Sequence, residues 1–234
     1  PEDIPAIVST GRIAAGITGH DYVVESGADV VEALDLGIGA GTIVVAAPRG
    51  KGWRGAEDVP DGAKIATKYA NIVRRFFEDL GKRVKIIQVS GSVEVLPMLG
   101  IADAVADVMA TGTTLALHGL EPIAEVLRTT ARLVVNKDSE REYTVRKLVV
   151  HLEALLKAQN KKMIFLNVPA DKISEVVSVL PAMESPSVAR LARGDMYEVF
   201  SVVDEAQLPD LVMKLREAGA KDVVVVPVEM LMRL

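Results

Sequence analysis

The stretch "ADAVADVMATGTTLALHGL", residues 102–120, runs from a strand-like segment directly into a turn of threonine and glycine. Asp103 and Asp107 interrupt the small and β-branched residues, and Thr111 to Thr114 follow at once. In an open parallel sheet, ligands bind beyond the carboxyl ends of the strands. Backbone N–H groups and hydroxyls in such a turn suit a phosphate group, and a carboxylate before the turn suits sugar hydroxyls. The stretch therefore predicts a strand whose end binds a phosphorylated ribose.

Strand and helix patterns alternate around this stretch, which favours an α/β fold with mostly parallel sheets. The predicted strands are 42–47, 63–67, 84–89, 102–109 and 131–136. Segment 68–81 predicts an amphipathic helix, and segment 92–100 a shorter one. A long helix at 142–162 is expected to mark a domain boundary.

A different order of elements follows that helix. The expected elements are strand 162–168, helix 170–180, strands 185–192 and 196–203, helix 205–218 and strand 222–228. This βαββαβ order is typical of a ferredoxin-like module. Asp204, with Gln207 three residues later, predicts a capping box for the helix at 205–218.

The composition excludes several classes of protein. The net charge of −5 argues against broad nucleic-acid binding. No apolar run approaches the ~18 residues of a membrane span, so no membrane partner is expected. The absence of cysteine fits a cytoplasmic location. His20, His118 and His151 are scattered, and no cluster of Cys and His predicts a metal held by the protein alone.

Four segments resemble, in the same order, those of ATP phosphoribosyltransferases, which catalyse the first step of histidine biosynthesis. They are "GITGHD" (16–21), "GAKIATKYANIVRRFF" (62–77), "VSGSVEVLPMLGIADAVADVMATGTTL" (89–115) and "MESPSVARLA" (183–192). The spacing of Asp107, Thr111, Gly112 and Thr114 also resembles the loop that binds 5-phosphoribosyl pyrophosphate (PRPP) in phosphoribosyltransferases. The ferredoxin-like tail resembles the regulatory domain of the family's long form.

The resemblance implies an α/β architecture of two parts: a two-lobed, periplasmic-binding-protein-like catalytic part and the βαββαβ C-terminal module. Residues 1–41 and 137–160 would form catalytic lobe I, and residues 42–136 lobe II with the PRPP loop. Residues 161–234 would form a regulatory domain that binds histidine. Relatives have a further strand and helix before the position of Pro1, so we expect the family's N-terminal strand to be missing from this sequence.

The resemblance also implies a reaction. N1 of the ATP adenine would displace pyrophosphate from C1 of PRPP, giving N1-(5′-phosphoribosyl)-ATP. Mg²⁺ would arrive on the pyrophosphate, histidine would inhibit, and the protein would be a homo-oligomer, either a dimer or a hexamer. Such displacements develop oxocarbenium character, so positioning and charge stabilisation should matter more than a strong base. No catalytic residue is therefore assigned.

Three sets of residues match the family's binding segments. The PRPP site would comprise Asp21, Asp107, Ala110, Thr111, Gly112, Thr113, Thr114 and Leu115. The cleft that receives ATP would include Gly16, Thr18, Gly19, Lys64, Tyr69, Ser90, Gly91, Ser92 and Glu94, with Asn71 and Arg74 nearby. The histidine site would comprise Asn167, Met183, Ser185 and Ser187. Ser92 could instead be only a helix N-cap, and Arg74 only part of a charged helix face.

A few residues depart from the family's pattern. Lys64 replaces Arg, Ala70 replaces Pro, and Ala116 stands where many relatives carry Arg. In the C-terminal module Asn167 replaces Asp and Ser187 replaces Thr, so we expect histidine to bind more weakly than in relatives.

Two other classes of protein share the expected architecture. Two-lobed solute-binding proteins close on small anions without catalysis, and effector domains of transcription factors have a similar fold. A preference for PRPP and ATP over an amino acid or sugar would distinguish the enzyme from both.

Overall fold

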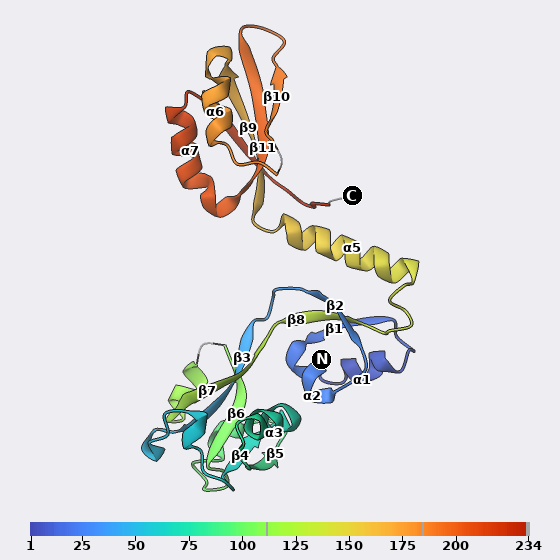
Figure 1. Cartoon of the computed structure of the whole chain (residues 1–234), viewed down its shortest axis with the longest axis vertical. Helices are drawn as coiled ribbons and strands as arrows, with labels where there is room; N and C mark the ends of the chain where they lie inside the picture. The colour runs from blue at the N-terminus through green and yellow to red at the C-terminus, as the bar shows by residue number, and fades with distance from the viewer. Residues whose placement is uncertain (111, 184, 233–234) are drawn as a thin grey trace. The chain divides into compact units, whose positions relative to one another are not determined.

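The computed structural model describes residues 1–110, 112–183 and 185–232 (Figure 1). Over these residues the strands form three sheets, and the chain divides into two compact units, Pro1–Arg146 and Lys147–Leu234. The division falls within the long helix α5 (Tyr143–Ala158). Within the same residues, no helix combines the length and hydropathy of a transmembrane span.

The first sheet of unit 1 is antiparallel and has the order β1-β8-β2. Its strands are β1 (Ala15–Gly19), β8 (Ala131–Val135) and β2 (Val31–Asp35). Helices α1 (Ile4–Ser9) and α2 (His20–Ser26) belong to this part, and a small core joins Val8, Val23 and Val134. Neither helix was predicted from the sequence, nor were β1 and β2, because each element is short.

The second sheet has the order β5-β4-β6-β3-β7. Its strands are β3 (Gly41–Pro48), β4 (Lys64–Thr67), β5 (Lys85–Gln88), β6 (Ala104–Met109) and β7 (Leu120–Thr129). The strands predicted at 42–47, 63–67, 84–89 and 102–109 are thereby confirmed, and so is the helix predicted at 68–81, α3 (Ala70–Asp79). Strand β7 was not predicted.

Short helical turns connect these strands. Helix α4 (Thr113–Leu117) follows β6, and the 3₁₀ turns are η1 (Arg49–Lys51), η2 (Ala56–Asp58) and η3 (Val93–Val95). The helix predicted at 92–100 is therefore reduced to the single turn η3, because Pro97 has no N–H group to continue a helix.

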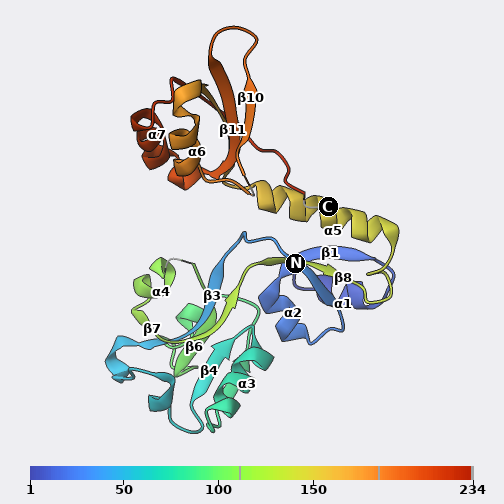
Figure 2. The same cartoon turned by 45° about the horizontal axis from the view of Figure 1, so that its top comes forward.

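Side chains alternate between the two faces of the second sheet, which α3 and α4 flank (Figure 2). On the face under α3, Ile43, Val45 and Ile65 of the strands pack with Val73 and Phe77 of the helix, all buried. The opposite face, toward α4, is lined by Val44, Ala46, Val105, Leu115 and Leu120. Both faces are apolar, so the functional side chains are found at the ends of the strands rather than on these faces.

The expectation of mostly parallel sheets is wrong. Among the strands of the described residues, β4 runs parallel to β5 and β6, whereas the other pairings are antiparallel. The reason is that the chain enters the second sheet along β3 and leaves it along β7, so these paired strands run in opposite directions (Figure 1). The chain returns to the first sheet at Thr130, because β8 pairs with β1 and β2. The return therefore comes before β8, and not at residue 136, where the expected lobe II ends.

Unit 2 has the βαββαβ order expected from the sequence. Its elements are β9 (Lys161–Pro169), η4 (Ala170–Lys172), α6 (Ile173–Val179), β10 (Ser187–Arg190), β11 (Met196–Asp204), η5 (Glu205–Gln207), α7 (Leu208–Glu217) and β12 (Asp222–Pro227). The sheet is antiparallel with the order β10-β11-β9-β12, and α6 and α7 lie on the same side of it (Figure 1).

The capping box predicted at Asp204 is wrong. Asp204 pairs with Lys161 in the β9–β11 register, and its carboxylate accepts a hydrogen bond from Lys161 Nζ at 2.5 Å. No side-chain cap is formed at Asp204. The lysine cation binds the carboxylate more strongly than a backbone N–H group would, so the ion pair displaces the cap.

Candidate functional site

The three parallel strands of the second sheet end at one edge. Thr67 at the end of β4 pairs with Gln88 on β5 and with Ala106 on β6. Asp107 and Lys68 each lie one residue beyond these pairs, so the two side chains come from neighbouring strand ends. The segments after β5 and β6 begin at the same edge, as the rule for ligand sites in open α/β sheets requires.

Asp107 faces a lysine that was not predicted from the sequence. Lys68 Nζ lies 3.8 Å from Asp107 Oδ1, and that oxygen also accepts the backbone N–H of Val108 at 2.8 Å. The Lys68 ammonium lies over two aromatic rings, 5.0 Å from the ring centre of Tyr69 and 5.8 Å from that of Tyr22. Both charged side chains remain partly exposed, at 27% for Lys68 and 30% for Asp107.

Asp21 is a buried carboxylate that joins the parts of unit 1 built on the two sheets. Tyr69 Oη donates a hydrogen bond to its Oδ2 at 2.7 Å, and Thr129 Oγ1 donates to its Oδ1 at 2.8 Å. Burial raises the pKa of the Tyr69 phenol, and the hydrogen bond to Asp21 raises that pKa further. Tyr69 therefore remains protonated and keeps donating to Asp21.

Gly19 is required by this arrangement. A Cβ atom at Gly19 would lie 2.1 Å from Asp21 Oδ1. A side chain at this position would displace the carboxylate, so the glycine of the "GITGHD" segment makes room for the aspartate two residues later.

Gly112 lies just before α4, in the turn that the sequence predicted to bind phosphate. Gly112 has φ +78°, in the left-handed region, and its carbonyl accepts the N–H of Ala116 at 3.1 Å at the start of α4. Thr113 and Thr114 are exposed at the first turn of α4. Leu115 is buried in the core beneath, so only its backbone is available to a ligand. Thr111 lies outside the described residues.

A pocket of about 510 Å³ opens beside Ala110. Hydroxyl and guanidinium groups dominate its polar lining, which includes Thr42, Arg128, Thr129, Thr130 and Arg132. Thr129 also binds Asp21, so this pocket and the Asp21 cluster share a side chain. Arg132 pairs with Glu32, its Nε lying 3.2 Å from Oε2, and with Asp35.

The segment 89–94 starts at the same sheet edge, where the Val89 N–H binds the carbonyl of Thr67 at 3.1 Å. Ser90 and Gly91 follow, and Glu94 lies in η3. Ser92 occupies the N-cap position of η3, as the alternative expected, but it has φ +52° and its side chain makes no cap hydrogen bond. A serine in the left-handed region is a strained conformation of a kind found at ligand sites.

Other predicted cleft residues lie elsewhere. Lys64 is at the opposite edge of the sheet from Asp107, where its N–H binds Asp103 Oδ2 at 2.9 Å. Gly16 lies under α1, where a Cβ would be 2.7 Å from Ile4 Cγ2. Thr18 is buried and donates to the carbonyl of Pro1 at 2.8 Å.

Asn71 and Arg74 serve the packing of α3. The Asn71 side-chain amide donates to the carbonyl of Glu25 at 2.9 Å, while the Glu25 carboxylate accepts the N–H groups of Asn71 and Ile72. Arg74 donates to Asn71 Oδ1 at 3.0 Å. These contacts cap α3 from α2 and give both residues a structural role.

The comparisons with known proteins identify the family. A model described as ATP phosphoribosyltransferase matches residues 1–157, and one described as the HisG C-terminal domain matches residues 158–230. The chain belongs to the ATP phosphoribosyltransferase family. Members are pentosyl transferases of histidine biosynthesis, so the binding-protein and transcription-factor alternatives are set aside.

The relatives match most of the chain. An ATP phosphoribosyltransferase of Pyrobaculum aerophilum is 62% identical over 231 residues, covering 99% of this chain and 82% of that protein. One of Ignicoccus hospitalis is 48% identical, with the same coverage. A solved HisG:HisZ complex of ATP phosphoribosyltransferase from Thermotoga maritima matches with a TM-score of 0.57 and 31% identity, covering 63% of this chain and 71% of that one.

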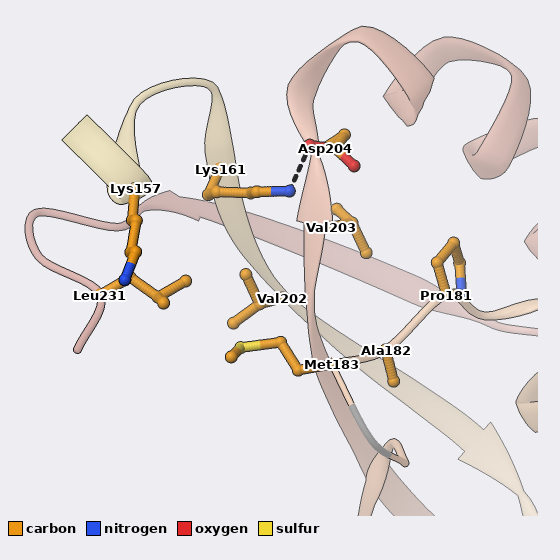
Figure 3. Close-up of a pocket in the computed structure, with 9 residues that line it drawn as sticks. All are labelled: Lys157, Lys161, Pro181, Ala182, Met183, Val202, Val203, Asp204 and Leu231. Atoms are coloured by element: carbon orange, nitrogen blue, oxygen red, sulfur yellow. Dashed lines mark hydrogen bonds and ion pairs between the residues drawn. The ribbon is translucent and has the colours of Figure 1, made fainter. Parts of the chain in front are cut away.

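In unit 2 the residues predicted to bind histidine are divided between the sheet, which holds Asn167 and Ser187, and the connection before β10, which holds Met183 and Ser185. Met183 lines a pocket of about 420 Å³ together with Lys157, Lys161, Val202 and Leu231 (Figure 3). Val202 of this pocket pairs with Met163 on β9, and Asn167 lies four residues further along β9. The distance along the strand from Met163 to Asn167 is about 13 Å, so Asn167 is remote from Val202. Asn167 Nδ2 donates to Asp222 Oδ2 at 3.1 Å. Ser187 starts β10, and Ser185 Oγ lies 3.4 Å from the carbonyl oxygen of Pro186.

Proposed function

We propose that the protein condenses ATP and PRPP to N1-(5′-phosphoribosyl)-ATP and pyrophosphate. The observation that carries this proposal is the position of Asp107, which lies one residue beyond the parallel pairing of β4 with β6 and five residues before the left-handed Gly112. A carboxylate there binds the ribose hydroxyls while the turn binds the 5′-phosphate. Family membership supplies ATP as the second substrate.

The residues then act by positioning. Asp107 and the 110–115 turn hold the ribose so that C1 faces the cleft, and the lone pair of adenine N1 forms the bond to C1. The electron pair of the C1–O bond leaves with the pyrophosphate. Asp21, held by Tyr69 and Thr129, fixes the part built on the β1-β8-β2 sheet against the other part. Orientation of this kind can supply much of a rate enhancement without an acid or base.

Magnesium is proposed to enter with the substrate. Within the described residues, no three His, Asp or Glu side chains converge as a metal site would require. The oxygens of pyrophosphate are ligands of the kind that Mg²⁺ prefers, so the substrate itself can carry the ion.

The test is product formation by the protein at its full natural length. With ATP, PRPP and Mg²⁺ together, ultraviolet absorbance should rise as the adenine is alkylated at N1, and pyrophosphate should appear in equal amount. Omitting PRPP or ATP is the control. Turnover of PRPP without ATP, or no turnover with both, would contradict the proposal.

We further propose that residues 161–234 bind histidine as a feedback inhibitor, in a homo-oligomer. Inhibition needs a second site whose two states differ in affinity for the end product. The side chains described above around Asp107 all come from unit 1. The support is the polar pair on the sheet, because Asp222 supplies the charge that Asn167 lacks. An ammonium group of histidine can bind there by a charge-assisted hydrogen bond.

Calorimetry with histidine tests this second proposal. Asp222→Asn should weaken histidine binding about tenfold, since a charge-assisted hydrogen bond is lost. Asp210→Asn on α7, which removes an exposed carboxylate of the same module, should change nothing. Absence of binding heat with the unaltered protein, or equal binding by both variants, would rule the sensor out.

A further inference from the structure

Lys68 is a cation at the end of β4, beside Asp107, and makes only a long ion pair with that carboxylate. Among the described residues its ion-pair partner is Asp107, at 3.8 Å, which exceeds hydrogen-bonding distance. The lysine directly follows β4 and directly precedes Tyr69, so the strand end and the start of α3 fix its backbone. Its ammonium is therefore held near Asp107 but is not hydrogen-bonded to that carboxylate.

Two aromatic rings hold this cation in place. Tyr22 comes from α2 and Tyr69 from the start of α3, and their ring centres are 6.1 Å apart. The Lys68 ammonium lies within cation–π range of both. Because the hydroxyl of Tyr69 is bound to Asp21, the Tyr69 ring cannot swing away, and Lys68 keeps its position.

The chemistry of PRPP says what lies next to Asp107. The carboxylate binds the hydroxyls on C2 and C3 of the ribose, and C2 is bonded to C1, which carries the pyrophosphate. Lys68 Nζ lies 3.8 Å from that carboxylate, so with the ribose bound there its ammonium would be within reach of the pyrophosphate oxygens. An empty site with Asp107 and Asp21 would repel such a polyanion, and Lys68 offsets that repulsion.

We propose that the Lys68 ammonium binds the pyrophosphate of PRPP and stabilises the negative charge that grows on it as the C1–O bond breaks. The electron pair of that bond passes to the pyrophosphate oxygen, adenine N1 supplies the pair for the new bond to C1, and Lys68 keeps its proton. This assignment rests on the proposed function and adds a leaving-group contact to it.

Ribose 5-phosphate separates this role from a purely structural one. It has the hydroxyls and the 5′-phosphate but no pyrophosphate. Lys68→Met, which keeps the stem on the tyrosine rings, should weaken PRPP binding about 10- to 100-fold and leave ribose 5-phosphate binding unchanged. In turnover assays kcat should fall as well, because the contact strengthens in the transition state. Lys68→Arg should restore most of both losses.

Lys51→Met is the matched control. It removes a lysine that pairs with Asp103 at 2.7 Å at the other edge of the same sheet, and it should leave both affinities unchanged. Equal weakening of PRPP and ribose 5-phosphate by Lys68→Met would mean that Lys68 only positions Asp107, and unchanged PRPP binding would also overturn the assignment. If the unaltered protein binds neither compound, the proposed function itself fails.

Discussion

Asp103 directly precedes β6 and Asp107 lies in its second half; each faces a lysine, yet the two pairs differ. Asp103 Oδ1 accepts Lys51 Nζ at 2.7 Å, and its Oδ2 accepts the N–H of Lys64 at 2.9 Å. Lys68 stays 3.8 Å from Asp107. The hydrogen bond from Lys51, followed by that from Lys64, lowers the pKa of Asp103.

The difference separates structure from function on one strand. Both oxygens of Asp103 are engaged at the amino end of β6, where the carboxylate ties the start of β4 to the start of β6. Asp107 lies toward the carboxyl end, two residues before Met109, which lines the pocket, and the Lys68 ammonium stays beyond hydrogen-bonding distance of it. A lysine–aspartate pair thus supports the fold at one end and a ligand site at the other.

The largest expected effect compares the two carboxylates directly. Asp107→Asn should weaken PRPP binding by about 1.5–3 kcal/mol, because a charge-assisted hydrogen bond to a ribose hydroxyl is lost. Asp103→Asn should leave PRPP binding unchanged. Calorimetric titration of both variants measures this, and similar losses in the two would abolish the distinction.

The next comparison concerns stability. Tyr69→Phe removes a donor from the buried Asp21, so the free energy of unfolding should fall by about 1–3 kcal/mol. Lys51→Met removes one of the two donors to the partly exposed Asp103 and should cost less than about 1 kcal/mol. Chemical denaturation of both variants gives the two losses of unfolding free energy. A larger loss for Lys51→Met would mean that the fold depends more on the Asp103 pair than on the Tyr69–Asp21 hydrogen bond.

Two glycines flank the same strand and sharpen the contrast. Gly100 and Gly112 have φ +70° and +78°, so alanine at either position should cost about 1–2 kcal/mol of stability. The added Cβ would meet nothing within 4 Å at Gly100, and the flexible Met109 Sδ at 3.2 Å at Gly112. Only Gly112→Ala should also weaken PRPP binding, measured by titration of both variants. Equal binding by the two would remove the turn from the site.

The smallest effect is a pH dependence. The folded-state pKa of Asp103 lies below its ordinary value of 3.8, so its contribution to stability is present above that value and disappears as pH falls through the lower, folded-state pKa. The stability advantage over Asp103→Asn, below about 1 kcal/mol for such an exposed pair, should be constant near neutral pH and vanish in strong acid. An advantage that grows on acidification would have the wrong sign.

The strands that the sequence predicted are the ones with uninterrupted apolar runs. Segments such as 42–47 and 84–89 are apolar enough to show where they pack. Strand β7 was missed because Glu121, Pro122 and Glu125 break its pattern. Strand β7 lies at the edge of its sheet, where proline and charged residues are tolerated. The residues that obscured the strand pattern in the sequence are therefore consistent with its edge position.

The candidate site was only partly predictable. Family motifs pointed to Asp21 and Tyr69, and the structure joins them by a hydrogen bond. Lys68 and Thr129 carry no signal in the sequence, because their roles depend on partners 39 and 108 residues away. Lys64 belongs to the motif by spacing, but it occupies the start of its strand, and the residues at the strand's end are those that reach Asp107.

The central place of β8 in its sheet also sets an order of events during synthesis. Strands β1 and β2 pair with β8 and not with each other, so neither has a partner until Val135 has left the ribosome. The ribosome adds roughly a hundred residues between Asp35 and Val135, which takes about 5 to 20 seconds. Over that interval the nascent β1 and β2 segments have exposed, unpaired edges. The β5-β4-β6-β3-β7 sheet, complete at Thr129, is therefore expected to assemble first and to present β8 to them.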